Sequence, residues 1–317
     1  MCGRVVRDAD DPFLGVSPFF RSLRTSRRVP DTSTSASTFR PLVIGAQYPA
    51  LERGLTADTL AAQGFGTTPY TVCTSHVVAG NGVVTDVLEV PADTVSAQLE
   101  HIFETRQPTA AKVGVVGSAA SAEAIFKILD AYLDGPLVLD LTLSGPSGED
   151  IAEPETVEIV SEHMSSAELV SASLTDATLL AGMEIPSLDD AQVAAQRVGQ
   201  LGASNVLLRC GRLATHHFDT ESEPPNYSVD LFYDGEDLAV FEAPFIEGVD
   251  KLSGRASGLM MSVLHSLWSG RSLVDALRAS KAVVTDAIHE ASQTDQPSPS
   301  SVYFGALHHR ILSDVTE

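Results

Sequence analysis

The chain has 317 residues and a formal net charge of −22, from 42 acidic and 20 basic side chains. This length suits one large α/β domain or two small ones, and the acidic surface argues against nucleic acid and anionic lipid as partners. No apolar run approaches the roughly 18 residues that a membrane span needs, and three scattered cysteines fit reduced thiols in a cytoplasmic protein.

Residues 1–40 differ in composition from the rest of the chain. They hold seven arginines and a serine- and threonine-rich run at 32–38, and they lack the continuous apolar segment of a secretion signal. We expect a flexible leader outside the fold, followed by a single domain over residues 41–317.

From residue 41 onward, short β-branched runs alternate with amphipathic helices. Strands are predicted at 42–46, 71–74, 112–117, 137–141, 168–171 and 205–209. Helices are predicted at 58–63, from 91–94 onward, after a Ser121 cap, at 157–163, and at 191–201 after a Ser187 cap. This alternation predicts a three-layer α/β fold, with a mostly parallel central sheet and helices on both of its faces.

The last third of the chain changes character. Residues 229–233 and 238–241, joined through Asp234-Gly235, predict a hairpin at a sheet edge. Two closing helices are expected at 259–268 and at 273–291, the second capped by Ser272 with Asp275 three residues on. No glycine-rich fingerprint follows the first strand, which disfavours dinucleotide-binding and P-loop folds.

Polar residues follow several of the predicted parallel strands. Ligands in such sheets bind beyond the carboxyl ends of the strands. One cleft is therefore expected to gather Ala46 and the segments 116–117, 140–144, 171–176 and 209–212. Arg209 is expected to be functional because a cation is expensive to place there. Asp140 and Asp58 are either functional acids or helix caps.

The loop at 250–258 runs into an apolar helix. Helix starts leave N–H groups unpaired and carry partial positive charge, so they suit phosphate. Lys251 and Arg255 add cations in a chain that is poor in them. The alternative is an ordinary loop with a serine cap.

Short segments in sequence order carry a family resemblance. Residues 95–99 read Val-Ser-Ala-Gln-Leu, 111–116 read Ala-Lys-Val-Gly-Val-Val, 241–244 read Phe-Glu-Ala-Pro and 305–309 read Gly-Ala-Leu-His-His. Their order and spacing resemble the ribokinase-like kinases, and most closely the hydroxymethylpyrimidine/phosphomethylpyrimidine kinases of thiamine biosynthesis. The resemblance covers residues 41–312 and implies that family's fold.

The resemblance also implies a reaction and its residues. The reaction is phosphorylation of a pyrimidine hydroxymethyl group, with ATP and Mg²⁺ as cofactors, and a second phosphorylation of the phosphate already there stays open. Gly254, Arg255 and Ala256 would surround the transferring phosphoryl group, and Ser257 would stand at the base position. The remaining implied roles are substrate contacts by Ala46, Asp58, Val115 and His76, nucleotide contacts by Asp140, Ser173, Arg209 and Lys251, and metal ligation by Asp140 and Asp176. A homodimer pairing along residues 238–241 is a further expectation.

Several positions depart from the family pattern. The family's Gly-Thr-Gly-Cys loop is here Gly254-Arg255-Ala256-Ser257. Ala256 adds a Cβ that could crowd a phosphate or forbid positive φ, and a serine is a poorer proton acceptor than a thiolate. Tyr48 replaces an acid in the first-strand loop. Two interpretations follow: a working kinase for a thiamine-type pyrimidine or a pyridoxal-type substrate, or a catalytically weak homologue that binds a nucleotide or heterocycle as a regulator.

Overall fold

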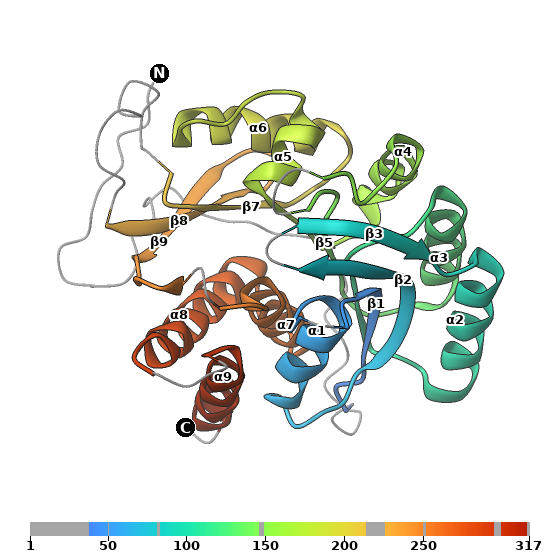
Figure 1. Ribbon diagram of the computed structural model, residues 1–317, viewed down its shortest axis with the longest axis horizontal. Helices are drawn as coiled ribbons and strands as arrows, with labels where there is room; N and C mark the ends of the chain where they lie inside the picture. Colours follow the sequence, from blue (N-terminus) through green and yellow to red (C-terminus); the bar gives the residue numbers. More distant parts are fainter. Residues whose placement is uncertain are drawn as a thin grey trace.

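The sheet prediction is confirmed. The structure, a computed structural model, describes residues 38–49, 51–80, 83–145, 149–213, 226–249, 252–294 and 299–315, so almost all of the expected leader lies outside the described residues. The described strands form one nine-stranded sheet in the order β3-β2-β1-β4-β5-β6-β7-β8-β9. Neighbours from β2 to β7 are parallel, and the antiparallel pairs lie toward the two edges (Figure 1).

The strands are short and mostly buried. Their bounds are β1 Pro41–Gln47, β2 Tyr70–Gly80, β3 Val83–Glu89, β4 Ala110–Val113, β5 Leu137–Leu141, β6 Leu169–Ser173, β7 Val206–Gly211, β8 Tyr227–Tyr233 and β9 Leu238–Pro244. The parallel strands are covered on both faces, which explains their continuous apolar runs. The predicted edge hairpin is the β8–β9 pair.

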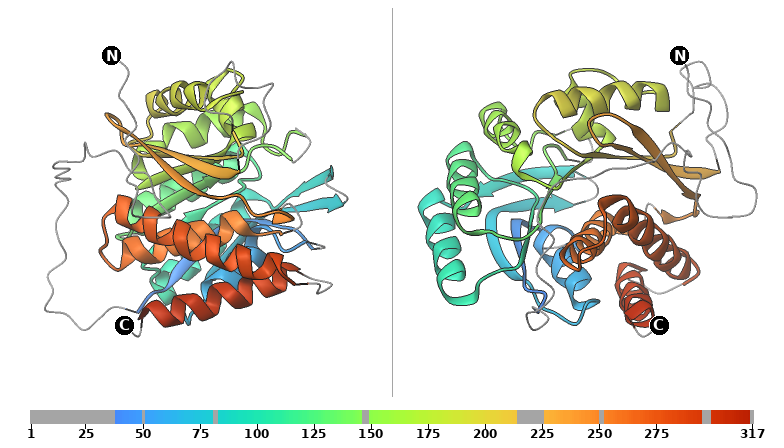
Figure 2. Two further views of the ribbon diagram at one scale, coloured as in Figure 1. Left: turned by 90° about the vertical axis from the view of Figure 1, so that its left-hand side faces the viewer. Right: turned by 180° about the vertical axis from the view of Figure 1, so that it is seen from behind.

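Helices cover the two faces of the sheet in two groups (Figure 2). One face carries α2 Ala92–Arg106, α3 Ala119–Tyr132, α4 Pro154–Glu162, α5 Leu174–Ala181 and α6 Leu188–Gln200. The other carries α1 Gly54–Gln63, α7 Arg255–Trp268, α8 Leu273–Ser292 and α9 Pro299–Val315. Within the described ranges, no helix combines the length and apolarity needed to cross a membrane.

Three elements were not predicted. The strand expected at 71–74 extends to Gly80 and turns back as β3, because the exposed outer strand lacks a continuous apolar run. Helix α5 is only eight residues long and follows β6 directly. Helix α9 covers residues 305–309, for which only the family resemblance was noted from the sequence. It buries Tyr303 and Leu307 against the α1, α7 and α8 layer.

Several helix starts also differ from prediction; α1, for example, begins at Gly54 instead of residue 58. Helix α3 is capped by Ser118, whose hydroxyl accepts a hydrogen bond from the Ser121 amide at 3.4 Å, so Ser121 is not the cap. Helix α7 begins at Arg255, one turn earlier than expected, after a left-handed Gly254. The earlier start brings residues 255–257 into the helical first turn, where backbone N–H groups lack intrahelical partners.

The aromatic cluster around His265 of α7 predicts that the stability of the protein depends on pH. His265 stacks on Phe65 with ring centroids 4.4 Å apart and meets Phe39 edge-on. Burial, followed by the charge of Arg271, lowers the pKa of His265 from 6.5 to about 4. Between these two pKa values the unfolded chain binds a proton at His265 and the folded chain does not. The free energy of unfolding therefore falls as the pH drops from 6.5 toward about 4. We expect His265→Phe to have a flatter profile of urea midpoint against pH. Identical profiles would contradict this account.

Candidate active site

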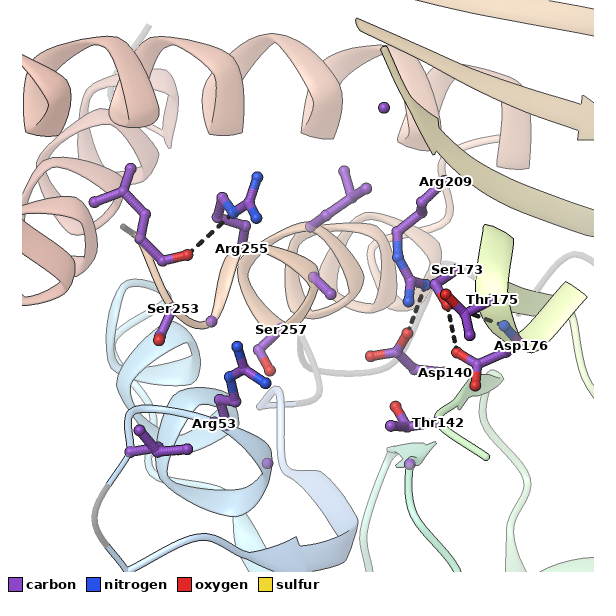
Figure 3. Close-up of a pocket in the computed structure, with 18 of the residues that line it drawn as sticks. Arg53, Asp140, Thr142, Ser173, Thr175, Asp176, Arg209, Ser253, Arg255 and Ser257 are labelled. Carbon is purple, nitrogen blue, oxygen red and sulfur yellow. Dashed lines mark hydrogen bonds and ion pairs between the residues drawn. The ribbon is translucent and has the colours of Figure 1, made fainter. Parts of the chain in front are cut away.

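The carboxyl ends of the parallel strands open into a pocket of about 630 Å³. Its walls come from strands near both lateral edges of the sheet and from helices α1, α7 and α8. The α7 start shares this pocket with Asp140 at the end of β5 and Arg209 in β7 (Figure 3). The predicted gathering of strand ends with residues 254–257 is therefore present, except that residues 116–117 do not line the pocket.

The first turn of α7 has no side chain among the described residues that caps its amides. Gly254 has φ +77° and offers no side chain to cap the helix. A Cβ there would lie 2.4 Å from the Phe304 ring and 3.1 Å from the Ala57 Cβ, so glycine is required. Arg255 is braced by a hydrogen bond from its Nε to the Leu252 carbonyl at 3.1 Å. The first turn contains no acidic residue, which keeps its positive end free of a built-in anion.

Ala256 fits this turn despite its Cβ. It lies inside α7 and lines the pocket. Gln107 is the one non-glycine residue with positive φ in the described part of the chain, so Ala256 has ordinary backbone angles. The family's glycine is therefore not required here for backbone conformation. Ser257 follows at 6 % exposure, also lining the pocket.

A buried chain of charges lies beside the α7 start. Lys112 Nζ lies 2.8 Å from Asp58 Oδ1 and 3.0 Å from Asp140 Oδ2. Arg209 contacts the other Asp140 oxygen at 2.8 Å and also hydrogen-bonds Ser171. Lys112, Asp58 and Asp140 are 3 %, 2 % and 5 % exposed. Two cations and two anions balance in this cluster, as burial requires.

The two carboxyl groups of this cluster differ in the direction of their pKa shifts. Burial raises the pKa of Asp140, but Lys112 and Arg209 outweigh it and hold that pKa below its ordinary value. Burial dominates at Asp58 and raises its pKa, although Lys112 opposes it. Burial lowers the pKa of Lys112, but Asp140 and Asp58 outweigh it, so the ammonium stays charged. Asp58 is thus the more basic carboxyl.

Asp176 organises the loop after β5. Its Oδ1 accepts hydrogen bonds from the Leu143 and Ser144 amides at 2.9 and 3.1 Å, and from the Ser144 hydroxyl at 3.0 Å. Its Oδ2 accepts one from Ser173 at 2.6 Å, and Ser173 caps α5. Both residues line the pocket as predicted. Their polar atoms are engaged in fixing the strand-end loops.

The structure places most of the predicted site residues together, with two exceptions. Ala46 and Val115 line the pocket beside β1 and after β4. His76 does not: it is exposed on β2, 4.0 Å from the Cys73 sulfur, while its neighbour Val77 is buried among Ala46 and Val115. Strand residues alternate between faces, so His76 lies on the opposite face of β2 from that cluster and does not line the pocket. Lys251 lies outside the described residues.

Two cations were missed as site residues. Lys112 was noted only as part of a strand motif, although a lysine inside an apolar strand is itself a signal for a buried ion pair. Arg53 immediately precedes α1 and lines the pocket, and Figure 3 shows it close to the α7 start. The β2–β3 hairpin also contributes to the wall through Val84. No sequence signal marked the hairpin as part of the site.

Comparison with protein-family models matches residues 53–299 to the phosphomethylpyrimidine kinase family. The hydroxymethylpyrimidine/phosphomethylpyrimidine kinase of Aquifex aeolicus is 29 % identical over 243 residues, which cover 76 % of this chain and 90 % of the relative. The enzyme of the same name from Rhizobium meliloti is 28 % identical, over 76 % of this chain and 87 % of its own length.

Solved structures show the same fold. Phosphomethylpyrimidine kinase from Clostridium difficile has a TM-score of 0.64 at 23 % identity, covering 79 % of this chain and all of that one. An ADP complex of Bacillus subtilis pyridoxal kinase has a TM-score of 0.68 at 24 % identity, covering 80 % of this chain and 93 % of that one. The family match spans more than three quarters of the sequence, and the fold agrees with it. The chain belongs to the phosphomethylpyrimidine kinase family.

Proposed function

We propose that this protein transfers the γ-phosphoryl group of ATP to the hydroxymethyl group of hydroxymethylpyrimidine, or to the phosphate of its monophosphate, in thiamine biosynthesis. The observation that carries the proposal is the meeting of the α7 start with Asp140 and Arg209 in one pocket. Phosphoryl transfer depends mainly on positioning and charge stabilisation, and this arrangement supplies amides without a side-chain cap and a guanidinium at one place.

The two ends of the pocket suit a heterocycle and a nucleotide. Toward β1 and β3, an apolar wall includes Tyr48, Val84 and Ile151. Toward β9 and α8, the wall includes Phe245 and Ile288. Helix α7 packs against the central strands β4 and β5, so its start lies between the two apolar walls of the pocket. A pyrimidine at the first wall and a nucleotide base at the second would bring hydroxyl and phosphate together at the centre.

The charged residues fit ATP and Mg²⁺ in different ways. The α7 amides, Arg255 and Arg209 would hold phosphate oxygens. Asp140 has both oxygens paired with cations and Asp176 has four hydrogen bonds. Mg²⁺ usually keeps several waters, so these carboxylates would reach it through water. A bound ion there would supply neutralisation of the phosphate charge. Our proposal further includes a cytoplasmic location and a homodimer pairing along the edge strand β9.

The test is a product assay with two heterocycles. Purified protein is incubated with ATP, Mg²⁺ and either hydroxymethylpyrimidine or pyridoxal, and phosphorylated product is quantified by mass spectrometry. We expect a higher kcat/KM for the pyrimidine. A higher value for pyridoxal would favour the pyridoxal-kinase alternative, which the similar fold of that enzyme motivates. No product, with ligands still raising the melting temperature, would contradict catalysis and support a binding protein.

A further inference from the structure

The start of α7 places Ser257 against a buried carboxyl group. The Ser257 side chain lies beside Asp58 of α1, where it is one of the groups that oppose the rise in pKa caused by burial of that carboxyl, and both residues line the pocket. Figure 3 shows the Ser257 side chain directed toward α1, the helix that carries Asp58. A serine hydroxyl is a weak base, so it needs a neighbouring group to receive its proton. Asp58 is in the place where such a group is required.

The two carboxyls that share Lys112 are not equally able to accept a proton. Asp140 has a second cation, Arg209, whereas the described residues provide Asp58 with Lys112 alone. A carboxylate with fewer cations loses less when it is protonated. The raised pKa of Asp58, caused first by burial, agrees with this order. Lys112 keeps Asp140 as its partner when Asp58 becomes neutral, so no cation is left unpaired.

The geometry points to a proton relay in which Ser257 takes the proton of the substrate hydroxyl and passes its own to Asp58. This inference rests on the proposed kinase function. The hydroxyl oxygen forms a bond to the γ-phosphorus while the bond from that phosphorus to the ADP oxygen breaks. The cluster then carries one additional positive charge beside the new phosphate ester, which favours the transfer. After product release, Asp58 returns the proton through Ser257 to water.

The test replaces Ser257 with cysteine, the family's residue at this position, so that the proton transfer no longer needs Asp58. We expect Asp58→Asn to lower kcat on the order of 100-fold, with KM for ATP changed less than about threefold. Ser257→Cys replaces the relaying hydroxyl with a thiol, which ionises without help. Adding Asp58→Asn to Ser257→Cys should then cost less than about threefold. Asp134→Asn, an exposed site outside the pocket, is the matched control and should leave kcat unchanged.

A second comparison separates the relay from a loss of folding. Ser257→Ala and Asp58→Asn should lower kcat equally, and their combination should lower it no further, because both remove one proton path. Equal fractional losses from Asp58→Asn in the serine and cysteine backgrounds would overturn the relay, since that is what a purely structural role predicts. An unchanged kcat in Asp58→Asn would overturn it too. Wild-type protein that forms no product would instead defeat the proposed function itself.

Discussion

Lys112→Met is expected to lower the free energy of unfolding by about 3–5 kcal/mol, because it removes the cation shared by two buried carboxylates. Asp140 keeps Arg209, but Asp58 would lose its cationic partner within the described cluster. The methionine matches the lysine stem in length, so packing changes little and the loss reports on charge. Urea unfolding at neutral pH measures it.

The double variant Lys112→Met with Asp58→Asn is the control for this charge argument. Removing the Asp58 charge leaves Asp140 with Arg209 as a balanced pair, so we expect the double variant to recover part of the lost stability. The recovery should be absent when Asp134→Asn, at an exposed position, is combined with Lys112→Met instead. A single variant that loses less than about 1 kcal/mol would show that the cluster is not held by this cation.

Gly254→Ala is expected to lower kcat on the order of 100-fold, an effect typical of removing a preorganised oxyanion donor. The alanine would be strained at φ +77° and its Cβ would meet the Phe304 ring, so the first turn of α7 has to move. Displaced amides no longer point at the transferring phosphoryl group. Steady-state kinetics with saturating ATP measures the effect.

Gly270→Ala is the matched control for that displacement. Gly270 follows the same helix at its other end, has φ +88°, and a Cβ there would meet nothing within 4 Å. It carries a similar backbone strain without touching the pocket, so it should lower the melting temperature while kcat stays near the wild-type value. Equal losses of kcat in both glycine variants would mean that α7 is merely destabilised.

Much of the fold was predictable because burial on both faces leaves a clear apolar signature. The strands β1, β5 and β7 show it, and so does the β8–β9 hairpin through its Asp234-Gly235 turn. The β2–β3 hairpin was not predictable in this way. Its outer strand is largely exposed, so tertiary pairing rather than an apolar run determines it.

The candidate site was predictable wherever a rule of topology placed a residue. Asp140 and Arg209 follow from the carboxyl-end rule for parallel sheets, and Ser257 follows from the family resemblance. The pairing of Asp58 with Lys112 joins residues 54 positions apart, and no local pattern encodes that distance. His76 was placed on the wrong face because its strand extends further than predicted and its residues alternate.

A crystal structure with a non-hydrolysable ATP analogue, Mg²⁺ and hydroxymethylpyrimidine tests the phosphate site most directly. We expect the terminal phosphate to accept hydrogen bonds from the amides of the first turn of α7, with Arg209 on the phosphate chain and the pyrimidine hydroxyl facing Ser257. Phosphates bound away from that turn, with a ligand-free α7 start, would contradict the site described for this protein.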